Sequence, residues 1–433
     1  MNKAQAYQAL FAIMMLTLLS VVGMAMPYPI LTPLLLEGSN PINQFIGIHP
    51  KLLLAALLAG YPLGILLGSS FIGSLSDVFG RKRTLLLTTL GSATGYLVTA
   101  FAAFQESFLL LLAARFFTGL CEGNIAIARA MCSDLHPIID KTRAMSMVYS
   151  VTYSGWLIGP LVGGYLMLLG ADFSFMIAAA ITFASALVIL LFVHDPEKTP
   201  SNAEPERKII GMSGLQRIFQ HAIRHNAYTL LSNTSIRHVF WQYLIIMLGL
   251  NAFYEFLPVW LHEDLNQDSV GIGHMTALVT LAMVLTSTVF IERCKGIFGI
   301  KPLIIAGLVV FGIAQSLSGI VDNSTVLYYC LVSGSAIAFF NVLLPVFLSD
   351  NYNHIEQGKL FGLLTSTFCL SNVIIALFGG AISLLGAANT LIFGGFLMFV
   401  GALYFHLYFS SESLKITKGL EQAEENIARE TTK

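Results

Sequence analysis

Long apolar segments separated by short polar ones make up almost the whole chain. Each segment is long enough to cross the roughly 30 Å of membrane hydrocarbon as a helix, which takes about 20 residues. Runs such as Leu109 to Ala114 do not alternate with polar residues, and this excludes the strands of a transmembrane barrel. The pattern predicts an all-α membrane protein with twelve spans, at about 8–36, 51–74, 84–104, 108–132, 143–169, 173–194, 238–261, 271–291, 302–321, 325–348, 359–384 and 388–410.

The composition supports this prediction. Hydrophobic residues make up 56% of the chain and charged residues 11%, against roughly 25% charged in an average soluble chain. So few charges exclude a soluble enzyme, a disordered chain and a secreted disulfide scaffold. The five cysteines fall singly within or beside apolar runs. Because the sequence shows no nucleophile–base set, metal-ligand cluster or phosphate loop, we expect no enzyme activity, no metal or other cofactor and no nucleic-acid partner.

Basic residues predict the orientation in the membrane. With the N-terminus in the cytoplasm, nearly all of the 23 Lys and Arg residues fall on the inner side, and Lys51 is the exception in the outer loops. We therefore expect a multi-pass protein of the bacterial inner membrane with both termini cytoplasmic. The polar segment after Asp195 divides the spans six and six. Its second half predicts an amphipathic helix on the inner surface, with one apolar side formed by Leu215, Ile218, Phe219 and Ala222.

The two halves of the chain resemble each other. A shift of 216 residues places Gly163-Gly164 on Gly379-Gly380, and a slightly larger shift places Phe79-Gly80 on Phe298-Gly299. Six spans per repeat is an even number, so both repeats point the same way, with a substrate site expected near the membrane midplane between them. The expected units are an N-terminal bundle (1–194), a cytoplasmic linker (195–237), a C-terminal bundle (238–411) and a cytoplasmic tail (412–433).

The loop after the second span reads Gly73-Ser-Leu-Ser-Asp77-Val-Phe-Gly80-Arg81-Lys-Arg. It resembles motif A of the major facilitator superfamily, G-x-L-x-D-x-x-G-R-K/R, at every fixed position and in the loop where that family carries it. The resemblance implies the fold of that superfamily, two parallel six-helix repeats. It also implies that this loop stabilises one transport state, and Asp134 at the inner end of the fourth span is the expected partner. Simple anchoring of the arginines on the cytoplasmic side explains neither Asp77 nor the glycines.

The fifth span contains Gly155-Trp-Leu-Ile-Gly159-Pro160-Leu-Val-Gly163-Gly164. It resembles motif C, G-x-x-x-G-P-x-x-G-G, which is typical of the antiporter branch of the superfamily. Three of the glycines recur every four residues, which allows a neighbouring backbone to approach closely. The proline removes a helix hydrogen bond and favours a kink. Glycine packing alone is the simpler interpretation.

The fourth span carries Arg115, Glu122 and Arg129, spaced seven apart. On one continuous helix this spacing drifts only about 20° per step, so the three residues share a face. Facing lipid would cost roughly 3 kcal/mol each, so the face must line a cavity or pair with other helices. Arg115-Phe-Phe-Thr-Gly119 also resembles motif B, R-x-x-x-G, whose arginine the family places near the proton-coupling carboxylates. We expect Glu122 to carry the proton or bind a cation; the alternative is a static Glu–Arg pair.

Glu255, in the seventh span, is a second candidate for proton coupling, with pairing at an outer gate as the alternative. Many drug:proton antiporters with twelve spans carry an acid in the first span. Here no acid precedes Glu37, so the carboxylate that couples protons would have to lie in another span, and this again favours Glu122. The alternative is a transporter without proton coupling. The expected wall of the substrate cavity combines aromatic rings and amides, which suit lipophilic or cationic compounds; its candidates are Tyr28, Asn251, Tyr254, Phe340, Asn341, Phe368 and Asn372.

The resemblance covers the whole chain and is nearest to the drug:proton antiporters. It implies a monomer in the lipid bilayer that exports amphipathic small molecules or drugs in exchange for protons by alternating access. A transporter of one specific metabolite, such as a siderophore, is the nearest alternative, in which Arg115 and Arg129 would bind an anionic group. A non-transporting membrane receptor is a further alternative.

Overall fold

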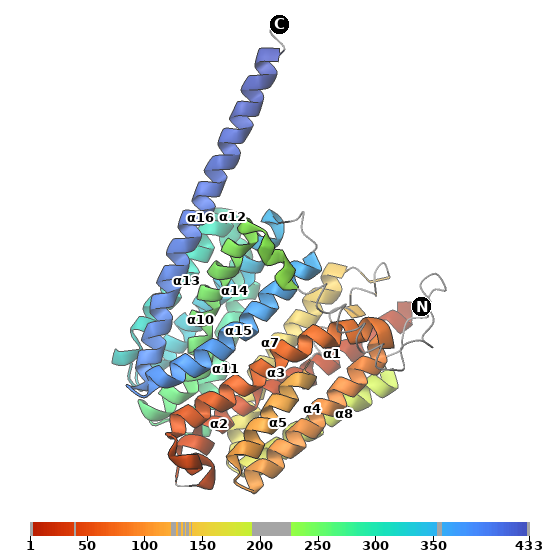
Figure 1. The fold of residues 1–433 in the computed structure, drawn as a ribbon, viewed down its shortest axis with the longest axis vertical. Coiled ribbons are helices and arrows are strands. Elements are labelled where there is room, and N and C mark those ends of the chain that lie inside the picture. Colours follow the sequence, from red (N-terminus) through yellow and green to blue (C-terminus); the bar gives the residue numbers. More distant parts are fainter. Residues whose placement is uncertain are drawn as a thin grey trace.

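The computed structural model describes residues 3–38, 40–122, 127–128, 131–132, 135, 138–139, 141–192, 227–352 and 357–430. Within these residues every regular element is a helix, and no strand occurs (Figure 1). The α-helices are α1 (Lys3–Ala25), α2 (Pro27–Leu36), α3 (Pro50–Phe79), α4 (Arg81–Phe104), α5 (Phe108–Cys121), α7 (Lys141–Met167), α8 (Ala171–Phe192), α10 (Thr234–Glu263), α11 (Ser269–Leu285), α12 (Ile291–Phe298), α13 (Ile300–Ser316), α14 (Val326–Asn351), α15 (Gln357–Ser383) and α16 (Ala387–Glu430). Short 3₁₀ helices are η1 (Pro41–Gly47), η4 (Ala227–Ser232) and η6 (Ser318–Ile320), and one π-helical turn, η5 (Thr286–Phe290), joins α11 to α12.

The predicted apolar segments fall on these helices, and ten described segments are long and apolar enough to cross a membrane. α5 is apolar but shorter. Two boundaries differ most from the sequence prediction. The span expected over 108–132 has its helix α5 end at Cys121, and the helix expected to end near 410 continues as α16 to Glu430 (Figure 1). The amphipathic helix expected in the linker lies outside the described residues.

The helices pack as two groups that meet along two seams. In the N-terminal group α3 packs on α5, α5 on α4, α4 on α8, α8 on α1 and α1 on α7. In the C-terminal group α15 packs on α10, α10 on α16, α16 on α13, α13 on α14 and α14 on α11. The groups contact each other where α3 meets α15 and where α7 meets α11. Side chains that face each other across a seam can therefore separate only if the two helix groups move apart.

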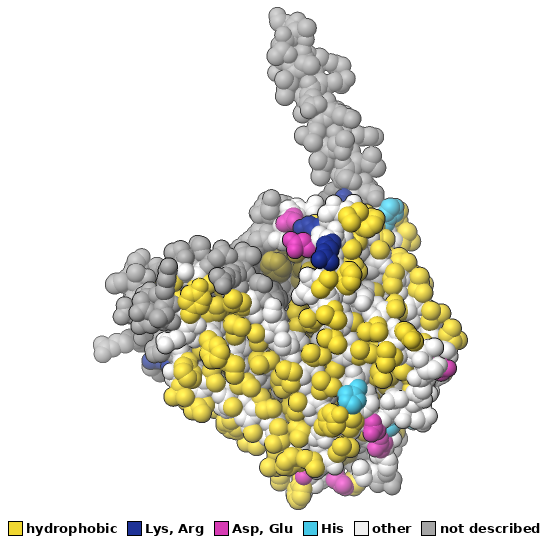
Figure 2. Space-filling view, turned by 180° about the vertical axis from the view of Figure 1, so that it is seen from behind, with side chains coloured by type: hydrophobic (Ala, Val, Ile, Leu, Met, Phe, Trp, Pro, Cys, Tyr) yellow, Lys and Arg dark blue, Asp and Glu magenta, His cyan; other side chains and the backbone are white. Residues whose placement is uncertain are grey.

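The surface is that of a membrane protein. Hydrophobic side chains cover the middle of the face in Figure 2, whereas Lys, Arg, Asp and Glu gather toward its two ends. Large exposed hydrophobic side chains include Phe104, Tyr328 and Phe396. Exposure of this kind would be costly in water and is favourable in lipid. The described part of the chain is thus built to cross the bilayer many times.

Two pairs of glycines show the same backbone conformation at related places in the two halves. Gly80 (φ 91°) joins α3 to α4, and Gly299 (φ 77°) joins α12 to α13. Gly170 (φ 110°) and Gly386 (φ 127°) precede α8 and α16. Positive φ is accessible to glycine at little cost. The shared turn explains why Gly80 and Gly299 match when one half of the sequence is compared with the other.

Candidate functional site

Arg115 is the centre of a buried polar cluster. It lies on α5 with only 4% of its surface exposed, and its Cζ atom is 4.4 Å from the centroid of the Tyr61 ring on α3. Its Nε and Nη1 atoms have no hydrogen-bond partner within the structure. α5 can sit this deeply because a Cβ at Gly64 or Gly68 of α3 would clash with the α5 backbone. A guanidinium held so far from water is stabilised chiefly by the aromatic face and by nearby negative charge.

Glu122 supplies that negative charge. Its half-buried side chain has Arg115 and Ser92 among its electrostatic neighbours, and Tyr61 and Tyr96 lie within range of its carboxylate. The structure therefore brings Arg115 and Glu122 together with Tyr61, Ser92 and Tyr96 from α3 and α4, while the proton-coupling role of Glu122 stays a prediction from sequence. The tyrosines were missed because an aromatic residue in an apolar helix gives no local signal of its partner.

The expected common helix face does not extend through Glu122. This residue is the C-cap of α5 and has non-helical angles, φ −81° and ψ 84°. Its N–H donates to the carbonyl of Gly119 at 3.0 Å, which closes the last turn of the helix. The heptad argument assumed an unbroken helix and was wrong on this point, because α5 ends at Cys121 and the angles of Glu122 are not helical. Arg129 lies outside the described residues.

Glycine contacts on both seams bring the helix groups close at one end of the bundle. A Cβ at Gly164 of α7 would lie 2.5 Å from the carbonyl oxygen of Ser269 on α11, and one at Gly273 would lie 2.7 Å from that of Pro160. On the other seam, a Cβ at Gly380 of α15 would clash with Ala55 of α3. Backbones pack this tightly only where the residue is glycine. We call this end, where α3 begins and α10 ends, the Lys51 end.

The remaining glycines of the motif C segment face the first helices. A Cβ at Gly155 would lie 2.7 Å from Val21, one at Gly159 would lie 2.7 Å from Ala25, and one at Gly163 would clash with Met26. α7 continues through Pro160 to Met167. The segment thus contacts its own group through three glycines, and it contacts the other group through Gly164 and the carbonyl of Pro160.

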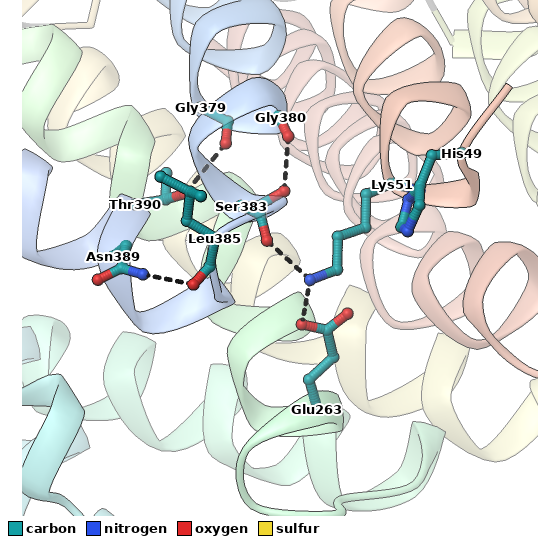
Figure 3. A network of polar contacts seen from close by, with 9 residues as sticks. All are labelled: His49, Lys51, Glu263, Gly379, Gly380, Ser383, Leu385, Asn389 and Thr390. Carbon is teal, nitrogen blue, oxygen red and sulfur yellow. Dashed lines mark hydrogen bonds and ion pairs between the residues drawn. The ribbon is translucent and has the colours of Figure 1, made fainter.

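A network of polar contacts joins the two groups at the Lys51 end (Figure 3). The Nζ atom of Lys51, on α3, lies 2.8 Å from Oε2 of Glu263 on α10. The same atom donates to the carbonyl of Ser383, the last residue of α15, at 2.7 Å. His262 Nδ1 lies 3.6 Å from Oε1 of Glu37, which follows α2. One ammonium thus holds two C-terminal helices against the N-terminal group.

A surface cavity of about 470 Å³ lies over this network, with Glu37, His49, Lys51, His262 and Glu263 in its lining. Acidic groups are crowded here. Burial and the neighbouring Glu263 carboxylate raise the pKa of Asp264, while Lys51 and a backbone hydrogen bond to Ala388 act in the opposite direction. Lys51 therefore offsets repulsion among acids as well as joining helices. The sequence showed Lys51 only as an exception to the charge pattern.

Replacing Lys51 with Met should weaken closure of the Lys51 end. The change leaves the Glu263 carboxylate and the Ser383 carbonyl without their shared donor, and losing a partly buried charged hydrogen bond costs about 1–2 kcal/mol. Spin labels at two exposed positions, Gln44 and Leu385, should then show a separated population several-fold larger than in the parent. The exposed Lys295→Met change is the control. Identical distance distributions in all three proteins would contradict a closing role for Lys51.

The candidates for the cavity wall divide into packed and half-buried residues. Asn251 is fully buried and donates to the Ser371 hydroxyl at 2.7 Å, and Asn372 donates to the carbonyl of Phe368 at 3.1 Å. Phe340 is fully buried, with its ring centroid 5.8 Å from that of Phe311. Asn251 and Phe340 thus join neighbouring helices, whereas Asn372 is hydrogen-bonded within α15. The half-buried candidates are Tyr28, Tyr254, Asn341 and Phe368.

Tyr28 occupies the place between the two groups. Its ring on α2 lies 5.8 Å from that of Trp156 on α7. Arg115 of the N-terminal group and Glu255 of the C-terminal group are both among its electrostatic neighbours. Tyr254, on α10, has Tyr28 in its own electrostatic surroundings. The sequence did not single out Trp156, although it lies within the motif C segment.

The surroundings of Gly73 and the side chain of Asp77 in the motif A segment, and Asp134 as a whole, lie outside the described part of the structure. Gly80 makes the tight turn that the motif predicts, and Arg81 begins α4. The pairing of Asp77 and Arg81 with Asp134 stays a prediction from sequence.

Comparisons with known proteins agree with this architecture. A model of the Major Facilitator Superfamily matches residues 13–291 and 239–429. The class H tetracycline resistance protein of Pasteurella multocida is 24% identical over 372 residues, 85% of this chain and 87% of that protein. The class B tetracycline resistance protein of Escherichia coli is 26% identical over 195 residues, 45% of this chain and 46% of that protein. The crystal structure of the human organic anion transporter MFSD10 superposes with a TM-score of 0.65 at 20% identity, covering 92% of this chain and 99% of that one.

Proposed function

Since this chain belongs to the major facilitator superfamily, we propose that it exports amphipathic small molecules in exchange for protons. The family and fold are those of a multi-pass membrane transporter rather than an enzyme. The relatives named as tetracycline resistance proteins favour drug-like cargo. In this proposal the Lys51 end faces outward, both termini lie in the cytoplasm, the membrane is the bacterial inner membrane, and the protein acts as a monomer.

The observation that carries the proposal is the buried cluster of Arg115 and Glu122. A protein that only anchors or assembles has little use for two ionisable groups deep in a membrane bundle, where each is expensive. Arg115 retains unpartnered N–H groups, so the cluster is not a saturated structural pair. In this proposal Glu122 exchanges a proton as its distance from Arg115 and from water changes.

Alternating access follows from the two seams. The glycine contacts and the Lys51 network close the outward end, so export requires them to separate. Movement of the groups would bring Tyr28, between Arg115 and Glu255, into different surroundings. The N-terminal group would then carry the proton on Glu122 while the substrate lies between the groups.

Transport in reconstituted vesicles tests the proposal. Purified protein should move lipophilic drug-like compounds faster when a pH gradient is imposed, and collapse of that gradient with a protonophore should remove the stimulation. Cationic and anionic test compounds should be compared in the same vesicles. Substrate flux that is independent of the gradient would exclude proton exchange, and the absence of flux for all compounds would exclude export of this class.

A further inference from the structure

His262 shares one ring nitrogen between the two helix groups. It is the penultimate residue of α10, and its Nδ1 atom lies 3.1 Å from the backbone carbonyl oxygen of Gln267 in its own group. The same atom lies 3.6 Å from Oε1 of Glu37, which belongs to the N-terminal group. A carbonyl and a carboxylate can only accept hydrogen bonds, so these neighbours place the hydrogen of the ring on Nδ1. A further proton then binds at Nε2 and makes the ring positive.

The turn that follows α10 fixes this ring within the C-terminal group. The N–H of Gln267 donates to the carbonyl of Leu261 at 2.9 Å, and the side-chain amide of Gln267 donates to Oδ1 of Asn323 at 2.9 Å. All of these partners belong to the C-terminal group, whereas Glu37 follows α2 of the N-terminal group. The distance from His262 to Glu37 therefore increases when the two groups separate at the Lys51 end.

Acidic groups outnumber basic ones around His262. The charged and titratable side chains near it are those of the cavity lining, with Asp264 at the end of α10 and Asp322 beside Asn323; the lining contributes Glu37, His49, Lys51, Glu263 and Asp268. The Lys51 ammonium opposes a second positive charge, but it lies 2.8 Å from the Glu263 carboxylate, which offsets its charge. Among the described residues, the ion contact of Glu37 is to His262. A positive ring at His262 therefore has a carboxylate of the other group as its partner.

Two other histidines at this end make contacts of a different kind. Nδ1 of His49 accepts the N–H of Lys51 at 3.2 Å, which caps α3 within the N-terminal group (Figure 3). His274, on α11, faces the other group across the second seam, where its Nε2 atom lies 3.0 Å from the hydroxyl of Tyr165 on α7. A hydroxyl can donate to a neutral ring or accept from a protonated one, so this contact persists in both forms. Of these three histidines, His262 is the one that faces a carboxylate of the other group.

We propose that protonation of His262 stabilises the closed form of the Lys51 end through an ion pair with Glu37 across the two helix groups. Histidine side chains change charge between about pH 5 and pH 8. The attraction exists only when the ring is protonated and the groups are together, so protonation and closure favour each other. The stabilisation is present at the acidic end of this range and is lost as the pH rises through it. The response does not depend on the substrate; its assignment to the pH outside the cell rests on the orientation in the proposed function.

Spin labels at the exposed positions Gln44 and Leu385, in the full chain without its five native cysteines, measure this closure. From pH 8 to pH 5.5 the ratio of separated to closed molecules should fall about threefold in the parent, as expected of a partly exposed ion pair. His262→Gln keeps a donor for the Gln267 carbonyl but does not titrate, so its ratio should be equal at both pH values. His262→Arg carries a permanent charge, for which the adjoining cavity leaves room, and should favour the closed form at both.

Two further variants separate this pair from other titrating groups. His49→Asn keeps an acceptor at the start of α3 and should respond to pH as the parent does. Glu122→Gln removes the carboxylate of the proposed proton exchange and should also keep the response. Equal ratios at both pH values in the parent, or a response that persists in His262→Gln, would overturn the proposal. A response lost in Glu122→Gln but kept in His262→Gln would assign the pH dependence to proton exchange instead. If only the His262 variants lose the response and vesicles show no flux driven by protons, the His262–Glu37 pair is supported and the proposed exchange is contradicted.

Discussion

Glu122→Gln should abolish accumulation driven by a pH gradient. In the parent, a gradient of one pH unit stores about 1.4 kcal/mol per proton, enough for about tenfold accumulation when one proton is exchanged per substrate. The glutamine side chain has nearly the same shape but cannot bind or release a proton at physiological pH. The accumulation ratio of the variant should therefore fall to about one with and without the gradient. Substrate binding and passive exchange should continue, because Glu122 lies beside Arg115 within the N-terminal group, whereas the substrate is proposed to lie between the two groups.

The measurement is uptake into inverted vesicles with and without the imposed gradient, at matched amounts of protein. Glu106→Gln, in the short loop between α4 and α5 where the residue is exposed, provides a control that removes a carboxylate from the same half. A Glu122→Gln protein that still concentrates substrate with protons would assign Glu122 a structural role. The proton would then have to travel on another buried carboxylate, and Glu255 would be the next candidate.

Helix length and apolar composition made most of the fold predictable. The span expected over 238–261 appears as Thr234–Glu263, and the one expected over 325–348 as Val326–Asn351. Such segments are predictable because, within lipid, every backbone polar group must be satisfied inside its own helix. The end of α5 was not predictable in this way. The residues after Cys121 include apolar ones suited to a helix, and only the angles of Glu122 reveal the break.

The candidate site was less predictable, because its contacts join residues far apart in the chain. Lys51 and Glu263 are separated by most of the N-terminal half, and no local pattern pairs them. Phe340 looked like a residue of the cavity wall because α14 is apolar on every side, so its sequence does not indicate which face is packed. Charges inside spans were the more reliable signal. From the sequence alone, Arg115 and Glu122 could be expected to face away from lipid, because neither can face it cheaply.

Gly159→Leu should destabilise the protein and stop transport. A Cβ at this position would lie 2.7 Å from the Cβ of Ala25 and 2.9 Å from the carbonyl of Val22, so even the first added carbon forces α7 away from α1. A leucine adds three more carbons at the same contact. Overpacking costs about 1–3 kcal/mol where side chains can adjust, and a backbone carbonyl adjusts less readily. Separation of α7 from α1 would also displace Gly164, which contacts Ser269 across the seam.

Ile158→Leu is the matched control, because Ile158 is the preceding residue of α7 and is 39% exposed on the surface. That variant should keep the melting temperature and transport rate of the parent. In Gly159→Leu we expect a lower melting temperature and, in the fraction that inserts correctly, passive leak of substrate through the poorly closed Lys51 end. Full activity with an unchanged melting temperature would show that α7 and α1 do not need this close approach. Leak without loss of stability would instead separate the sealing role of the glycine segment from its role in packing.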